Sequence, residues 1–337
     1  MWTRAPLLLA LGLLWPAPAA AQDPLSAIEW LDREMAGFPE QARPAEPPVT
    51  DSAAPGEISV SPIGRPSKDA VGLIPARIAG LPDDLWAASQ AGDLSARLQD
   101  MQPGMLPSMR RLLFTLLLTE LDPPAESAPE GPLFLARVDT LMRFGAVEQA
   151  RALLERAGAD RPESFRRYFD AALLTGTEDA ACAALRSRPN LSPGFAERIF
   201  CLARSGDWEA AALTLETARA LGFLSAYEDA LLVRFLDPAL FEGLPPLAPP
   251  SAPSPLVFRV AEAIGEPVPT TTLPLSFAQA DLRANIGWKA QLEAAERLAR
   301  SGAVPANRLL GLYTERRPAA SGRSEERRVG KECPSPC

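Results

Sequence analysis

The apolar residues of this chain recur every three or four positions, which is the spacing of an amphipathic α-helix. A short first helix is expected over residues 22–36, where Asp23-Pro24 supplies an N-cap and a first-turn proline. From residue 67 onward the same pattern predicts a succession of helices bounded by glycine and proline. Outside the central region, these helices are expected at residues 83–89, 93–99, 106–121, 256–264, 276–283, 287–300 and 307–315. The pattern therefore predicts an all-α fold.

Three glycines divide the central region into similar units. Gly145, Gly176 and Gly206 lie 31 and 30 residues apart, and each separates two helical runs. The runs that follow them read GAVEQARALL, GTEDAACAAL and GDWEAAALTL. This register aligns an acidic residue, an alanine and a leucine in each unit: Glu148, Asp179 and Glu209; Ala150, Ala181 and Ala211; Leu154, Leu185 and Leu215. Helix–glycine–helix units at a fixed period predict a helical-hairpin α-solenoid.

The third unit carries a more specific pattern. Its residues Gly206-Asp-Trp208-Glu-Ala-Ala211 resemble the start of the second helix of a tetratricopeptide repeat (TPR). The position of Trp208 is occupied by Val147 and Glu178 in the other two units. We therefore expect a TPR-like solenoid, in which tryptophans pack within the core or between repeats, and the alternative is an irregular helical bundle.

Proline-rich stretches set the expected domain boundaries. Residues 37–66 contain seven prolines and few large apolar side chains, which predicts a disordered linker. Residues 244–255 contain six prolines and predict a break in the helical array. The helical repeat domain is expected over 67–243, and residues 256–322 are expected to continue the repeats up to a truncated end.

The N-terminus has the pattern of a secretory signal peptide over residues 1–21. Arg4 supplies the positive charge, residues 7–15 are apolar, and three alanines ending at Ala21 precede cleavage before Gln22. The apolar run is shorter than the ~20 residues that a membrane span needs, although a retained anchor helix is the alternative. The mature chain is expected to be exported to the periplasm without an integral membrane span.

The C-terminal tail is expected to be an artefact. Residues 323–333, RSEERRVGKEC, resemble the translation of a common sequencing adapter. Lys331, one of only three lysines, and two of the four cysteines lie within residues 323–337. The natural chain is then expected to continue beyond Gly322 with a different sequence, and a charged, disordered tail is the alternative.

Composition and charge narrow the possible chemistry. The 337 residues include 34 basic and 42 acidic residues and no histidine, for a net charge of −8. The acidic balance argues against binding to nucleic acid, and the lack of histidine excludes Ser-His-Asp catalysis and most zinc sites. Adjacent carboxylates, as at Asp83-Asp84, Glu178-Asp179 and Glu228-Asp229, are expected to cap helices. No catalytic residue, cofactor site or metal site is predicted.

Cys182 and Cys201 form the one covalent pair that the pattern predicts. They lie on successive helices, and their midpoint falls within the connecting turn, at residues 188–192. Two antiparallel helices joined there hold both cysteines at the same height, as a disulfide requires. An oxidising compartment favours the disulfide, with two buried thiols or a redox pair as alternatives.

Three segments also resemble a known family. Residues 133–158, 198–222 and 287–322 are similar to a family of exported α-helical proteins from GC-rich Gram-negative bacteria, over nearly all of 22–322. Some members carry the label antifreeze glycopeptide polyprotein, but the Thr-Ala-Ala array of such glycopeptides is absent from this sequence. The resemblance implies a longer full-length protein and no catalytic residues.

Two functions fit these observations. The first is a non-enzymatic periplasmic scaffold that binds protein partners of the cell envelope through concave helix faces. The alternative is the superhelical portion of a cell-wall glycan-cleaving enzyme whose catalytic domain lies downstream, since that chemistry uses carboxylates.

Overall fold

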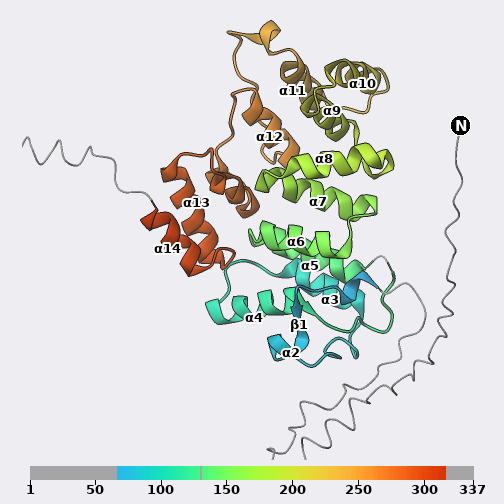
Figure 1. The fold of residues 1–337 in the computed structure, drawn as a ribbon, viewed down its shortest axis with the longest axis vertical. Helices are drawn as coiled ribbons and strands as arrows, with labels where there is room; N and C mark the ends of the chain where they lie inside the picture. Colours follow the sequence, from blue (N-terminus) through green and yellow to red (C-terminus); the bar gives the residue numbers. More distant parts are fainter. Residues whose placement is uncertain (1–66, 130, 316–337) are drawn as a thin grey trace, which may run out of the picture. The chain divides into compact units, whose positions relative to one another are not determined.

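The fold is known from a computed structural model that describes residues 67–129 and 131–315 (Figure 1). The expected signal peptide with Ala21 and Gln22, the helix over 22–36, the linker over 37–66 and the tail over 323–337 lie outside the described residues. The described residues form an all-α fold, as predicted. Their only strands are β1 (Ile74–Pro75) and β2 (Thr119–Glu120), which pair in parallel with Ile74 opposite Thr119.

The helices follow one another with short connections. The α-helices are α2 (Ala76–Ala79), α3 (Ala91–Asp100), α4 (Pro107–Leu118), α5 (Pro132–Arg143), α6 (Val147–Ala157), α7 (Pro162–Thr175), α8 (Glu178–Ser187), α9 (Phe195–Arg204), α10 (Trp208–Ala220), α11 (Ala226–Leu236), α12 (Pro255–Ala263), α13 (Trp288–Ser301) and α14 (Ala306–Thr314). The 3₁₀ helices are η2 (Lys68–Ala70), η3 (Pro189–Leu191), η4 (Pro238–Phe241), η5 (Thr270–Thr272) and η6 (Leu275–Leu282).

The three glycines of the predicted units lie at the turns of three helix pairs: α5–α6, α7–α8 and α9–α10. Gly145, Gly176 and Gly206 have φ angles of 81°, 75° and 85°, a left-handed conformation that glycine adopts without a steric penalty. From α5 to α11, each helix packs against the next one in sequence (Figure 1). The chain therefore forms a consecutive stack of short-turn helix pairs.

The segment after the proline-rich stretch does not simply extend this stack. Helix α12 packs against α7, and η6 packs against both α5 and α7. Phe258 of α12 and Phe277 of η6 share a buried cluster with Val147 of α6. Helix α12 packs against α11 as well as α7, and the described part of residues 256–322 also folds back over the first two helix pairs. The expectation that residues 256–322 continue the repeats stays a prediction.

A buried arginine ties the N-terminal elements to α5. Arg137 is almost fully buried, and its Nε, Nη1 and Nη2 atoms donate to the carbonyl oxygens of Leu117, Asp69 and Thr119 at 2.9, 3.0 and 3.0 Å. The Asp69 carboxylate accepts a hydrogen bond from the Phe134 amide at 2.6 Å. Burial lowers the pKa of Arg137 to about 10, although the charge of Asp69 opposes that shift.

Two local expectations differ from the structure. Residues 83–89 form turns rather than a helix, and most of 276–283 forms the 3₁₀ helix η6. Helix α9 begins at Phe195 with Gly194 as its N-cap, and the Ser192 hydroxyl donates to the Gly194 carbonyl at 2.6 Å.

Candidate functional site

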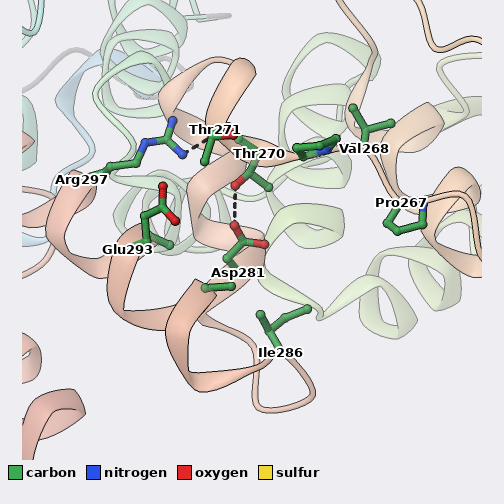
Figure 2. A pocket seen from close by; sticks show the side chains of 11 residues that line it. Pro267, Val268, Thr270, Thr271, Asp281, Ile286, Glu293 and Arg297 are labelled. Carbon is green, nitrogen blue, oxygen red and sulfur yellow. Dashed lines mark hydrogen bonds between the residues drawn. The ribbon is translucent and has the colours of Figure 1, made fainter.

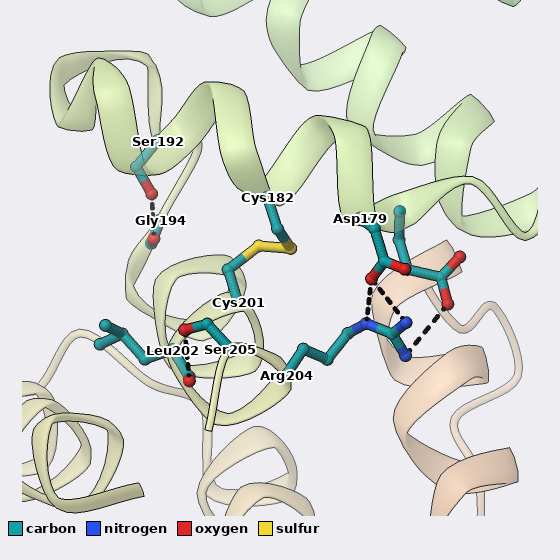
Figure 3. The surroundings of a disulfide bond; sticks show 9 residues. Asp179, Cys182, Ser192, Gly194, Cys201, Leu202, Arg204 and Ser205 are labelled. Carbon is teal, nitrogen blue, oxygen red and sulfur yellow. Dashed lines mark hydrogen bonds and ion pairs between the residues drawn. A yellow bond between two sulfur atoms is a disulfide. The ribbon is translucent and has the colours of Figure 1, made fainter. Parts of the chain in front are cut away.

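The predicted disulfide between Cys182 and Cys201 is present (Figure 3). It joins α8 to α9, with 5.1 Å between the two Cα atoms, a distance in the range that unstrained disulfides span. Both cysteines are buried and belong to the same apolar cluster as Phe200 and Leu185. Their burial indicates a structural disulfide that fixes the second helix pair against the third.

An ion-pair network lies beside the disulfide, as Figure 3 shows for Arg204. Arg204 of α9 contacts Asp179 at 2.7 Å and Glu178 at 3.3 Å, both in the first turn of α8. Arg259 of α12 binds the same Glu178 carboxylate at 2.6 Å, and it also pairs with Glu262. The expectation that Glu178 caps a helix is corrected by the structure: its side chain is buried and joins three helices.

The network continues toward η6. The Arg283 guanidinium donates to both carboxylate oxygens of Glu262, at 2.7 and 2.8 Å. The Arg283 side chain also lies over the turn of the second helix pair, where a Cβ added to Gly176 would come within 2.9 Å of the Arg283 Cδ atom. Charged side chains from α12 and η6 therefore hold the fold-back segment against the second turn.

The fold-back segment also covers the first turn. A Cβ added to Gly145 would meet Leu298 of α13 at 2.5 Å and Leu275 of η6 at 3.0 Å. One residue into α6, Glu148 binds the Arg308 guanidinium of α14 at 2.6 Å. Apolar side chains thus cover the α5–α6 turn, and Glu148, at the start of α6, is paired with an arginine.

The third turn is different. A Cβ added to Gly206 would have no neighbour within 4 Å. At the aligned position two residues later, Val147 is 0% and Glu178 is 3% exposed, whereas Trp208 is 50% exposed. The Trp208 ring contacts Phe235 of α11, the helix that follows the third pair, with ring centroids 6.2 Å apart, so it packs against the next unit while half of it stays exposed. The third turn lacks the cover of the other two.

A shallow cavity of about 260 Å³ lies next to the third turn. The residues that line it are Phe200, Arg204, Phe235, Arg259, Glu262, Ala263 and Asn285. Phe235 belongs both to this cavity and to the contact with Trp208. Its aromatic walls and charged rim could hold an apolar side chain that carries a polar tip.

A second cavity, of about 370 Å³, lies between α13 and residues 267–271 (Figure 2). Asp281, Glu293 and Arg297 bring charge to walls that are otherwise mostly apolar. The Asp281 carboxylate accepts a hydrogen bond from the Thr270 hydroxyl, and the Arg297 guanidinium donates to the Thr270 carbonyl at 3.2 Å. Burial raises the pKa of Asp281, against the lowering effect of that hydrogen bond. The arrangement could hold a small polar molecule.

Carboxylates also gather on the first helices of the pairs. Burial raises the pKa of Asp170 on α7 to about 7. The charges of Glu197 and Asp139 raise it further, whereas those of Arg166 and Arg167 lower it. Arg167 is itself committed to Asp139, because Nε and Nη2 donate to the two carboxylate oxygens at 2.6 and 2.7 Å. Asp170 is therefore the titratable group whose charge costs most in this part of the stack.

Comparisons with known proteins supply no relative for this chain. No protein-family model, no curated protein and no solved structure matches it. Within residues 67–129 and 131–315, no helix is long and apolar enough to cross a membrane. The same residues contain no group of three or more cysteine or carboxylate side chains placed to hold a metal ion.

Sequence reasoning predicts the disulfide but not the other features of this region. The two cysteines are 19 positions apart across one turn, so helix geometry alone brings them together. Arg259 and Arg308 lie 81 and 160 positions from the acids that they bind, and helical periodicity does not encode such pairings. The only sequence signal for the exposed third turn is the alignment of the three units. It places Trp208 where the other two units have Val147 and Glu178, both of which are buried.

Proposed function

We propose that this protein is a TPR-like helical-repeat scaffold of the periplasm that binds protein partners of the cell envelope. The observation that carries the proposal is the exposure of large apolar side chains on the last of the three helix pairs. Trp208, Leu213, Leu221 and Phe223 are all exposed, on α10 and the turn that follows it. Grouped apolar side chains on a surface mark sites of protein contact, because water solvates them poorly.

Other features agree with a binding role. The ring of Phe223 stacks on Phe195 with centroids 5.0 Å apart, which holds an exposed aromatic surface in a fixed orientation. Rigid aromatic side chains lose little conformational entropy on binding and often supply much of an interface's affinity. The buried disulfide is compatible with an oxidising compartment such as the periplasm.

The binding surface that we propose is smaller than the full inner face of a solenoid. Helices α5 and α7 are covered in part by η6, and α7 also by α12. Exposed large apolar side chains also lie on α4, at Met109 and Leu112, and we place the proposed surface at α10 because α10 and the turn after it carry four of them. The alternative function, a portion of a glycan-cleaving enzyme, concerns a domain beyond this sequence and stays a prediction.

Photocross-linking in the source bacterium tests the proposal. A photoreactive residue would replace, one at a time, Trp208, Leu221 and Met109, all exposed apolar positions. We expect ultraviolet light to produce discrete protein adducts in the periplasmic fraction, and the N-terminus of the recovered chain to begin at Gln22. If no position yields an adduct, or if the chain stays in the cytoplasm, the proposed function is wrong.

A further inference from the structure

The three aligned turns differ in what covers them, although the paired acids do not all fall on equivalent positions: Glu148 aligns with Glu209, whereas Glu178 aligns with Trp208. The first two turns each receive a close side chain from the fold-back segment: Leu298 over Gly145 and Arg283 over Gly176. Each also has an acid in the first turn of the second helix that is paired with an arginine from that segment. Glu148 binds Arg308, and Glu178 binds Arg259, both at 2.6 Å.

The third turn also has a large apolar side chain and an acid, but both are exposed. Trp208 is half exposed, and Glu209 is exposed in the first turn of α10. Within the described residues, Glu209 forms no ion pair or side-chain hydrogen bond. Asp207 adds a second carboxylate, which caps α10 through the Ala210 amide at 3.3 Å. We call Gly206, Asp207, Trp208, Glu209 and Phe235 the open edge.

On this basis we propose that the open edge binds a segment of a partner protein that carries a bulky apolar side chain and a nearby arginine or lysine. The inference rests on the proposed scaffold function and names its site and the chemistry of its partner. The apolar side chain would cover Trp208 and Phe235 as Phe258 and Phe277 cover Val147. The basic group would pair with Glu209 as Arg308 pairs with Glu148.

Charge at the open edge favours a basic partner. Glu209 and Asp207 are both exposed, and the nearest arginine of the network, Arg204, is already committed to Asp179 and Glu178. The whole chain carries a net charge of −8, so its long-range field also attracts cationic segments. An acidic segment would leave Glu209 and Asp207 facing like charge.

Continuity with the intramolecular interface supports the location. The cavity lined by Phe200 and Phe235 is also lined by Arg259 and Glu262, which belong to the ion-pair network of the second turn. A partner segment at the open edge would therefore extend an existing row of contacts from the second turn to the third. At the first two turns, the covering side chain lies close to the glycine backbone: Leu298 at Gly145 and Arg283 at Gly176.

A pair of synthetic peptides tests this inference with the full chain. Both are 14-residue amphipathic peptides with the same leucine and phenylalanine face, and they differ only in carrying arginine or glutamate at the flanking positions. Binding is followed by the fluorescence anisotropy of the labelled peptide. We expect the arginine peptide to bind about tenfold more tightly than the glutamate peptide, a difference of ~1.4 kcal/mol.

Three variants locate the binding. Trp208→Ala is expected to weaken the arginine peptide at least about fivefold because it removes the aromatic anchor. Glu209→Gln is expected to weaken it about two- to fivefold and to reduce the preference for arginine over glutamate. Leu310→Ala is the control, since Leu310 is also exposed but lies on α14, which packs against α13, and affinity should change by less than about twofold.

The outcomes separate this inference from the proposed function. Equal binding of the two peptides, no binding, or an equal loss in Trp208→Ala and Leu310→Ala would each overturn the open edge as a basic-segment site. Circular dichroism and the intact disulfide establish that each variant is folded. If cross-linking then yields adducts from Met109 or Leu221 but none from Trp208, the scaffold function stands and the inference fails. If no position yields adducts, both fail.

Discussion

The buried carboxylate of Glu178 on α8 lies 2.6 Å from the guanidinium of Arg259 on α12, although 81 positions separate the two residues. Arg204 of α9 approaches the same carboxylate at 3.3 Å. A single buried acid thereby connects the second helix pair, the third pair and the fold-back segment. Without Glu178, Arg204 would keep Asp179 and Arg259 would keep Glu262, but each arginine would lose a charged partner away from water.

Replacing Glu178 with glutamine should therefore destabilise the protein strongly. We expect Glu178→Gln to lower the free energy of unfolding by about 1.5–3 kcal/mol, since Arg259 would keep its charge in a buried site with Glu262 as its remaining partner. Urea denaturation followed by circular dichroism measures the change. The control is Arg300→Gln, which breaks the exposed pair with Glu296 and should cost less than about 1 kcal/mol. Equal effects of the two substitutions would contradict the role given to Glu178.

The glycine turns allow a comparison at matched backbone geometry. Gly145→Ala and Gly206→Ala both place a Cβ at φ above 80°, which costs about 1–2 kcal/mol. Only the first substitution also drives the Cβ into Leu298 and Leu275, for which overpacking adds about 1–3 kcal/mol. Urea midpoints should therefore fall further for Gly145→Ala. An equal fall for both variants would mean that the fold-back segment does not press on the first turn.

The disulfide should contribute to stability without being needed for the fold of the pair. The loop closed by Cys182 and Cys201 spans 19 positions, for which chain entropy suggests a contribution of about 3 kcal/mol. Double substitution of both cysteines with serine should lower the unfolding free energy by about that amount. Mass spectrometry of an unreduced digest should recover one peptide pair that joins the two residues. Recovery of both peptides as free thiols would show the pairing to be wrong.

The raised pKa of Asp170 predicts how the stability of the protein changes with pH. Burial raises its pKa to about 7 in the folded chain, above the value of 3.8 expected when unfolded. The folded state therefore binds the proton more tightly, and stability from this group is greatest below pH 4 and falls as the pH rises to 7. Asp170→Asn should be more stable than the natural chain at pH 8 and nearly equal at pH 4.

Chemical denaturation at both pH values measures this difference. Asp93→Asn, at an exposed position in the first turn of α3, is the matched control and should leave the pH dependence unchanged. A gain in Asp170→Asn that is the same at pH 4 and pH 8 would rule out the titration of Asp170 as its cause.

Local geometry explains which parts of this fold the sequence predicts. The all-α class and the three glycine turns follow from apolar spacing and from the conformations that only glycine adopts readily. Cys182 and Cys201 can be paired because a single turn relates them. The same reasoning places Trp208 in the correct register and does not predict that half of it is exposed, since exposure depends on whether a distant segment covers the position.

Contacts between distant segments explain what sequence reasoning misses. Arg137 lies within an amphipathic pattern whose polar positions would ordinarily face water, yet it donates to carbonyl groups of Asp69 and Thr119. Its acceptors are backbone atoms, which carry no side-chain signal. Likewise, nothing in residues 256–322 distinguishes helices that extend a stack from helices that return to cover it. The cavity around Asp281 depends on that same return.

The return of the chain also has a consequence for the order in which the protein folds. In a repeat array with neighbour contacts only, each unit can complete its core as soon as its neighbours are present. Here Val147 contacts the cluster that contains Phe277, and Glu148 binds Arg308, which lies 160 positions later in the chain. Contacts of such long range slow folding and leave early surfaces open to other proteins. The first of the three helix pairs is thus among the last parts of the fold to be completed, and a chaperone that protects it until Arg308 has docked on Glu148 would meet this need.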